Sequence, residues 1–224
     1  MLYNAIKTSK GIKLEAEKPV FGENYNIGYI GFSNNDSTVA KVIKWGTKYD
    51  KKGKMEASHA LIVISETECI EALAGQGVVI SPLSKYFDGN EFDIIFRRPK
   101  DYNQDFAQQL VEIAKKQKGA PYSKKAIATS IFRGLFTGHI IDLITKNRLL
   151  DVLCENHFGK QTFICSGLVA YCLQKISNWK YNSSGVLKRK FGGINPNELL
   201  YDDEIFEPFE INWSIGFNFN VVVV

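Results

Sequence analysis

The chemistry that this sequence could perform centres on one cysteine, Cys165. It lies between an extended segment expected at 161–164 and a helix expected to begin near Ser166. A helix N-terminus carries partial positive charge and free N–H groups, which can lower a thiol pKa from about 8.5 to between roughly 3.5 and 7.5 and contribute to an oxyanion hole. The small residues Ser166 and Gly167 would leave room for a substrate backbone. Position alone still favours a buried structural cysteine, so a base must be identified as well.

The base is expected to be His59, one of 3 histidines. It precedes the apolar run 60–64, which is typical of a strand covered on both faces. A hairpin centred near Ser65 would set His59 opposite Glu71 on one face, where the carboxylate could fix the imidazole tautomer and support the imidazolium. A register shift of one residue would move Glu71 to the other face. Glu68 is the alternative orienting residue.

The surrounding pattern predicts strands first and helices afterwards. The strand segments are residues 27–33, 60–64, 69–73, 78–80 and 92–96, the last four expected to form an antiparallel meander. Helical spacing predicts helices over 105–118, 124–153 and 165–176. We therefore expect residues 1–224 to form a single α+β domain in which an antiparallel sheet packs against helices. Its parts are a strand-rich region at 27–96, a helical insertion at 124–160 and the Cys165 helix within 161–180.

Four short segments resemble a known enzyme family. Residues 119–122 (GAPY) and 163–169 (FICSGLV) resemble the nucleophile half of the NlpC-type papain-like cell-wall peptidases. Residues 58–63 (SHALIV) and 70–72 (IEA) resemble the base half, where the catalytic histidine begins a strand and a polar third member follows on the next one.

The order of these halves resembles a circular permutation. The cysteine half comes first in the ordinary family, whereas here the histidine half does, as in the YiiX-like permuted papain-fold hydrolases, where Glu is a usual third member. Residues 77–83 (GVVISPL) and 195–199 (NPNEL) are also similar to that branch, and the resemblance covers roughly residues 27–210. It implies a papain-like fold with permuted topology, the triad Cys165, His59 and Glu71, and a cleft lined by Tyr122.

Two departures and one competing motif qualify the resemblance. Ile164 replaces the Asp that usually precedes the cysteine, and the segment between Tyr122 and Cys165 is much longer than in a minimal peptidase. Residues 154–158 (CENHF) resemble the box of the lecithin:retinol acyltransferase group, which would make Cys154 the nucleophile. In that group the box opens a long helix, but here GKQ follows at once, so Cys165 is preferred.

Composition and spacing argue against several other classes. The net charge of +4 over 224 residues is too mild to indicate a nucleic-acid binder. Cys154, His157, Cys165 and Cys172 could suggest zinc, but without a C-x-x-C or H-x-x-x-H pair we expect no metal and no other cofactor. With no secretion signal or membrane-spanning run, we expect free thiols and a cytoplasmic location, phage- or virion-associated delivery being the alternative.

The expected activity is hydrolysis of an amide or peptide bond through an acyl-thioenzyme, as in a cysteine peptidase or amidase. The resemblance suggests cell-wall peptides or lipid-linked amides as substrates. The apolar segment 126–153 is either a helical cap or an apolar wall for an acyl chain. A thiol-dependent acyltransferase and a lipid-binding module on the same fold are the alternatives, and the sequence leaves the oligomeric state open.

Overall fold

The computed structural model describes residues 19–34, 57–87, 93–123 and 162–208, together with the backbone of two short paired strands. These two strands are β1 (Ile6–Lys7) and β2 (Lys13–Leu14). The predicted insertion at 124–160, and with it Cys154, lies outside the described residues.

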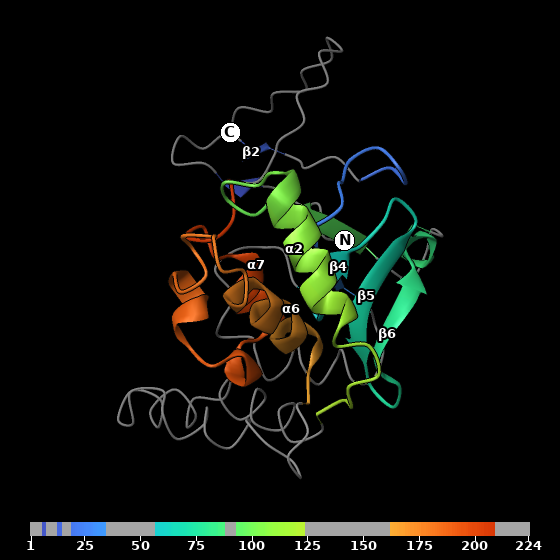
Figure 1. The fold of residues 1–224 in the computed structure, drawn as a ribbon. Coiled ribbons are helices and arrows are strands. Elements are labelled where there is room, and N and C mark those ends of the chain that lie inside the picture. Colours follow the sequence, from blue (N-terminus) through green and yellow to red (C-terminus); the bar gives the residue numbers. More distant parts are fainter. Residues whose placement is uncertain are drawn as a thin grey trace, which may run out of the picture.

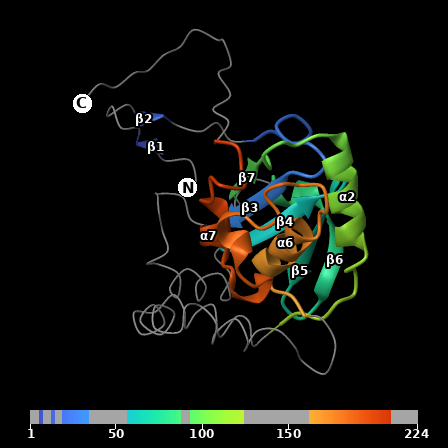
Figure 2. The same ribbon diagram turned by 60° about the vertical axis from the view of Figure 1, so that its left-hand side comes forward.

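A five-stranded antiparallel sheet forms the centre of the fold, in the order β6-β5-β4-β3-β7 (Figures 1 and 2). The strands are β3 (Ile30–Asn34), β4 (His59–Val63), β5 (Glu68–Leu73), β6 (Gly77–Pro82) and β7 (Asp93–Arg97). The expected α+β class with an antiparallel sheet is confirmed.

The expected meander is correct for β4, β5 and β6 but wrong for β7. Instead of following β6, β7 pairs with β3 at the opposite edge, where Ile94 lies across from Ser33. In this position Ile94 and Ile95 are buried in separate clusters on the two faces of the sheet. Burial of both side chains favours this edge, because successive strand residues point to opposite faces.

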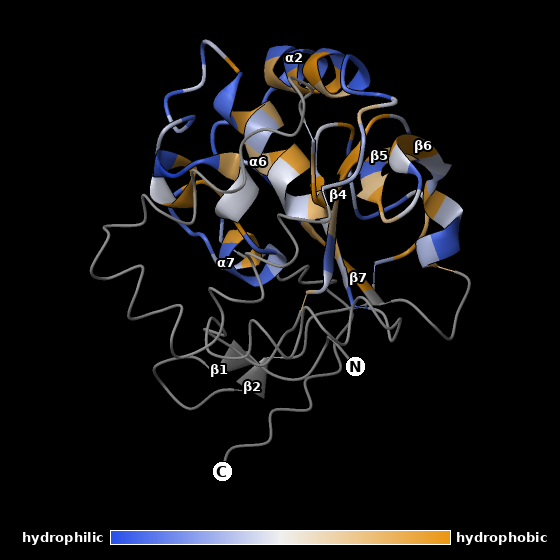
Figure 3. Ribbon diagram, turned by 90° about the horizontal axis from the view of Figure 1, so that it is seen from below, coloured by the Kyte–Doolittle hydropathy of each residue, from blue (hydrophilic) through white to orange (hydrophobic). Residues whose placement is uncertain are grey.

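Helices cover one face of the sheet. They are α2 (Gln104–Lys115), α6 (Cys165–Gln174) and α7 (Pro196–Leu200), and the 3-10 helices η2 (Gly185–Lys188) and η3 (Phe191–Gly193) lie between α6 and α7. Figure 1 shows α2 and α6 in front of the strands. In Figure 3 α2 alternates between blue and orange, as expected of an amphipathic helix whose apolar side packs on the core.

Two apolar clusters fill the space on either side of the sheet. Ile62 and Ile70 pack on the helical side with Leu168 of α6. Leu61 and Val63 pack on the other side in a cluster that includes Tyr25, Tyr29, Leu83 and Tyr86. Strand β4 is buried along its whole length, which confirms that it is covered on both faces. No helix in the described ranges is long and apolar enough to cross a membrane.

Helix α7 fixes the chain just before β4. Asn195 caps it through a capping box with Glu198, and Pro196 follows the cap, so the NPNEL segment is a helix start. The side-chain oxygen of buried Asn197 accepts a hydrogen bond of 2.8 Å from the backbone N–H of Ala57. Because Ala57 lies two positions before His59, this bond holds the start of β4 against the helical layer.

Candidate active site

His59 and Glu71 contact each other across two strands. The distance between His59 Nε2 and Glu71 Oε2 is 2.7 Å. The expected register is wrong by two residues, because Glu71 pairs with Leu61 rather than with His59. A shift of two residues keeps a side chain on the same face, so the contact forms between diagonal neighbours.

The Glu71 carboxylate is fully buried and satisfied on both oxygens. Oε2 accepts a hydrogen bond of 2.6 Å from the Tyr86 hydroxyl as well as the contact with His59, while Oε1 forms an ion pair with Lys85 Nζ. Burial raises the pKa of this carboxyl, but hydrogen bonds and charge from His59, followed by hydrogen bonds from Lys85 and Ser81, lower it well below its ordinary range. Glu71 is therefore an anion in the folded protein.

Cys165 is the first residue of α6 and lies at the start of β4. The ladder between β4 and β5 begins only at Leu61, so β5 does not use the backbone N–H of Ala60. That N–H and the N–H of Ser166 donate hydrogen bonds to the Cys165 sulfur. His59 contacts the same sulfur, and since its Nε2 faces Glu71, Nδ1 is the ring nitrogen available to the thiol. The end of the sheet and the start of the helix thus meet at one sulfur atom.

The electrostatics favour a charged pair of Cys165 and His59. Burial raises the pKa of the Cys165 thiol, but the positive charge and hydrogen bond of His59 outweigh it and leave that pKa lowered. Burial lowers the pKa of His59, yet the negative charges of Cys165 and Glu71 raise it to about 9. Each group thus favours the charged form of the other, which shifts the pair toward a thiolate beside an imidazolium, and a thiolate is the reactive form of cysteine.

Tyr122 lies close to this pair, on a segment that links β6 to the residues before Cys165. The backbone N–H of Gly119 donates a hydrogen bond of 2.8 Å to the Val78 carbonyl. The backbone N–H of Val78 donates one of 2.8 Å to the Ala120 carbonyl. Further along, Tyr122 forms a parallel bridge with Phe163. Burial and the negative charge of Cys165 raise the pKa of the Tyr122 phenol. Its ring thus lies within electrostatic reach of the sulfur and keeps its proton.

Likeness to known proteins adds no support to this geometry. No family model matches the chain. No curated protein matches it significantly either. The chemistry of the site therefore rests on the contacts of Cys165, His59 and Glu71.

Ser166 and Gly167 do not leave the open space expected beside the nucleophile. The Ser166 side chain is buried and donates a hydrogen bond of 2.7 Å to the Ile194 carbonyl. A Cβ on Gly167 would lie 3.1 Å from the Phe191 carbonyl oxygen. The small residues thus accommodate the loop before α7, and their expected place beside a substrate backbone stays a prediction.

The other expected candidates are placed as follows. Glu68, the alternative orienting residue, is exposed at the start of β5 and pairs with Pro82. Cys69 and Cys172 are buried free thiols whose pKa values are raised by burial, so both are neutral. Within the described part of the chain, no group of three or more potential metal ligands is present.

Sequence reasoning missed Lys85 and Tyr86, both of which bind Glu71. They belong to the 3-10 helix η1 (Leu83–Tyr86), which begins at the last residue of the GVVISPL segment. Their polar groups come right after the strand that pairs with β5, which was the available signal. The helix η1 turns the chain back toward β5 and so brings both side chains to the Glu71 carboxylate. A strand pattern in the sequence does not predict this change of direction.

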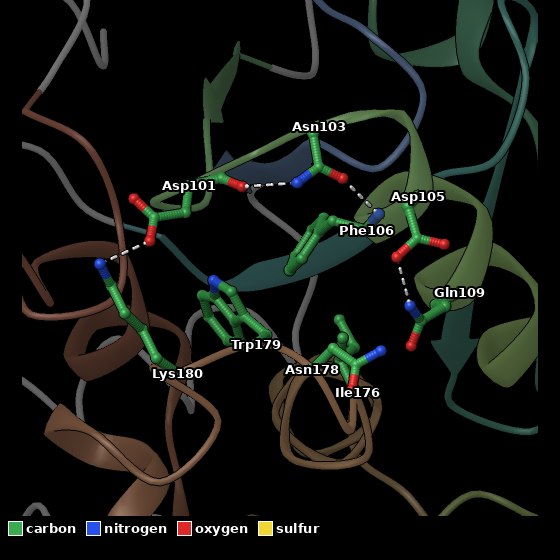
Figure 4. A pocket seen from close by; sticks show the side chains of 9 residues that line it. All are labelled: Asp101, Asn103, Asp105, Phe106, Gln109, Ile176, Asn178, Trp179 and Lys180. Atoms are coloured by element: carbon green, nitrogen blue, oxygen red, sulfur yellow. Dashed lines mark hydrogen bonds and ion pairs between the residues drawn. The ribbon is translucent and has the colours of Figure 1, made fainter.

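A pocket of about 230 Å³ lies elsewhere, between the start of α2 and the chain after α6 (Figure 4). Its charged groups are paired with each other or with neighbours: Lys180 with Asp101 at 2.7 Å, and Gln109 with Asp105 at 2.8 Å. The residues that line it include neither a cysteine nor a histidine. It therefore offers no nucleophile and is separate from the site at Cys165.

Proposed function

We propose that the protein is a cysteine hydrolase that cleaves an amide or peptide bond. Cys165 is the nucleophile, His59 moves the proton, and Glu71 orients His59. The observation that carries the proposal is the chain of contacts from the sulfur at the head of α6, through the imidazole, to a buried carboxylate. A buried ionised carboxylate, a raised histidine pKa and a lowered thiol pKa in one cluster are typical of catalytic sites.

The reaction follows from the charge state of the pair. The Cys165 thiolate attacks the carbonyl carbon, and the developing oxyanion is stabilised by N–H groups at the start of α6, with the neutral Tyr122 hydroxyl as a further donor. The His59 imidazolium gives its proton to the leaving nitrogen as the C–N bond breaks, and an acyl-thioester remains. Neutral His59 then removes a proton from water, which attacks the thioester. The C–S bond breaks, a carboxylic acid leaves, and the thiolate–imidazolium pair is restored.

The fold that we propose for this enzyme is the circularly permuted papain-like one. The support is the order of the parts: the strand with the histidine comes first, the strand with the glutamate follows, and the helix with the cysteine comes later and packs on the same sheet. Cell-wall peptides or lipid-linked amides are the substrates in keeping with this proposal. A lipid-binding role would depend on residues 126–153, all of which lie outside the described residues.

An alkylation experiment tests the site without a known substrate. The protein is treated with iodoacetamide from about pH 5 to about pH 9, and the modified cysteines are identified by peptide mass spectrometry. We expect selective modification of Cys165 well below the ordinary thiol pKa, and loss of that reactivity in His59→Ala. Preferential labelling of Cys69, or labelling of Cys165 only near its ordinary pKa, would refute the assignment.

An acyltransferase is the second candidate, and the burial of the site favours it. The Cys165 residue is 2% exposed and the His59 residue 9% exposed, so access of bulk water to the thioester is limited. An amine or lipid acceptor would then replace water in the second step. Incubation with a thioester donor and a primary amine, followed by mass spectrometry, distinguishes the two: an amide product indicates transfer, and a free acid alone indicates hydrolysis.

A further inference from the structure

The two oxygens of Glu71 have different partners. Oε2 is shared by His59 Nε2 at 2.7 Å and the Tyr86 hydroxyl at 2.6 Å. Oε1 forms an ion pair with Lys85 Nζ, and its other neighbour, the Cys69 sulfur, is 3.9 Å away. Each oxygen therefore has one cationic partner when His59 is protonated. Only one of these cations takes part in the proposed reaction.

The position of Lys85 follows from the turn after β6. The backbone N–H of Leu83 donates a hydrogen bond of 2.8 Å to the Thr67 carbonyl, and the Leu83 side chain is buried. This anchor directs the next residues of η1 back toward β5. The Tyr86 ring stacks on the His59 ring at 6.3 Å between centroids and 16° between planes, and Lys85 Nζ lies 4.9 Å from the Tyr86 centroid. One short helix therefore contacts both the base and the residue that orients it.

Catalysis would change the charge around Glu71. When His59 gives its proton to the leaving group, the buried carboxylate loses its nearest cation. An unpaired buried carboxylate is strongly unfavourable. The Lys85 side chain is 32% exposed, and its positive charge does not depend on the proton of His59.

We propose that Lys85 is a positioning residue that keeps Glu71 ionised throughout the reaction, by supplying a fixed positive charge to the oxygen that His59 does not use. This inference rests on the proposed function and deepens it. With Lys85 included, the thiolate, imidazolium, carboxylate and ammonium form a cluster of zero net charge. The other groups that face Glu71 are Ser81 on β6, Cys69 on its own strand and Tyr86 on η1, all uncharged.

Loss of the Lys85 charge should shift the pH profile of Cys165 alkylation in a defined direction. Removing a positive charge favours the protonated form of every neighbouring group. In Lys85→Met the pH profile of Cys165 alkylation should therefore move upward at both inflections, by about half a pH unit to one unit. The lower inflection is formation of the thiolate–imidazolium pair, and the upper one is loss of the imidazolium proton. Lys85→Arg keeps the charge and should keep the wild-type profile.

A matched control comes from a second 3-10 helix. Lys188 is the last residue of such a helix, whereas Lys85 is the last but one of η1, and Lys188 pairs with Glu204 at 3.1 Å, outside the site. Lys188→Met should leave both inflections in place. Lys85→Gln, which retains a donor toward Oε1 without the charge, should behave like Lys85→Met and replaces it if that variant does not fold.

The outcomes separate this inference from the proposed function. The experiment measures iodoacetamide alkylation of the full chain, with the modified cysteine identified by mass spectrometry. Upward shifts in Lys85→Met and Lys85→Gln alone support the role of Lys85. Unchanged inflections in both variants, or an equal shift in Lys188→Met, overturn it while leaving a reactive, His59-dependent Cys165 intact. Absence of that reactivity in the wild-type protein instead overturns the proposed function.

Discussion

The contact between His59 and Glu71 gives a quantitative prediction for Glu71→Gln. The surroundings raise the pKa of His59 from its ordinary 6.5 to about 9. Since one pKa unit corresponds to about 1.4 kcal/mol, they favour the imidazolium by about 3.5 kcal/mol. An opposite charge in direct contact accounts for about one to three pKa units. Replacing the carboxylate by an amide should therefore lower the His59 pKa by at least about one unit.

The consequence for the nucleophile follows from the pairing of charges. A less stable imidazolium shifts the equilibrium from the thiolate–imidazolium pair toward the neutral thiol and imidazole, by at least about tenfold. Glu71→Gln should therefore move the upper inflection of the Cys165 alkylation profile, where the imidazolium loses its proton, from near 9 to about 8 or lower.

Two measurements check this prediction. Alkylation kinetics give the inflections, and titration of the imidazole Cε1–H signal by NMR gives the His59 pKa directly. Glu204→Gln removes an exposed carboxylate that pairs with Lys188, and serves as the control. If the upper inflection stays near 9 in Glu71→Gln, Glu71 does not hold the imidazolium, and the electrostatic argument is refuted.

Two further predictions concern stability. Asn197→Ala should reduce the free energy of unfolding by about 1–3 kcal/mol, because it leaves the buried Ala57 N–H without its acceptor; denaturant unfolding measures the loss. The contribution of the Cys165–His59 pair to the free energy of unfolding of the wild-type protein should not change between about pH 6.5 and about pH 8.5. In that range the folded and unfolded chains bind the same number of protons at the pair. At lower pH this contribution should decrease, because His59 takes up a proton in the unfolded chain. At higher pH it should also decrease, because the thiol loses its proton in the unfolded chain while His59 stays charged in the folded protein up to about pH 9. A steady slope between these limits would show that the folded pair does not hold one proton in total over this range.

Local pattern was sufficient to place the main parts of the site. The apolar run after His59 predicted β4, and helical spacing after Cys165 predicted α6, because each signal depends on residues that are neighbours in the chain. The extended backbone of Ile164 and the helical start at Cys165 also agree with the expected junction.

Register and strand order depended on details that the pattern does not contain. In the hairpin between β4 and β5, the Ser65 hydroxyl accepts hydrogen bonds from the backbone N–H groups of Thr67 and Glu68. This turn centres the hairpin one residue later than expected and so shifts the pairing by two. The pairing of β7 with β3 is set by burial on both faces, which only the assembled fold defines. Lys85 reaches Glu71 through a turn, so it was not predicted.

The hydrogen bond between Ala57 and Asn197 joins residues 140 positions apart, and this distance orders the assembly of the site during synthesis. The ribosome releases His59 and Glu71 early and Cys165 much later. The Ser166 side chain also bonds with Ile194, just before α7. A growing chain therefore contains all three residues before it contains the segment that fixes both β4 and α6. The Cys165 thiol is thus synthesised last of the three, after all five strands of the sheet.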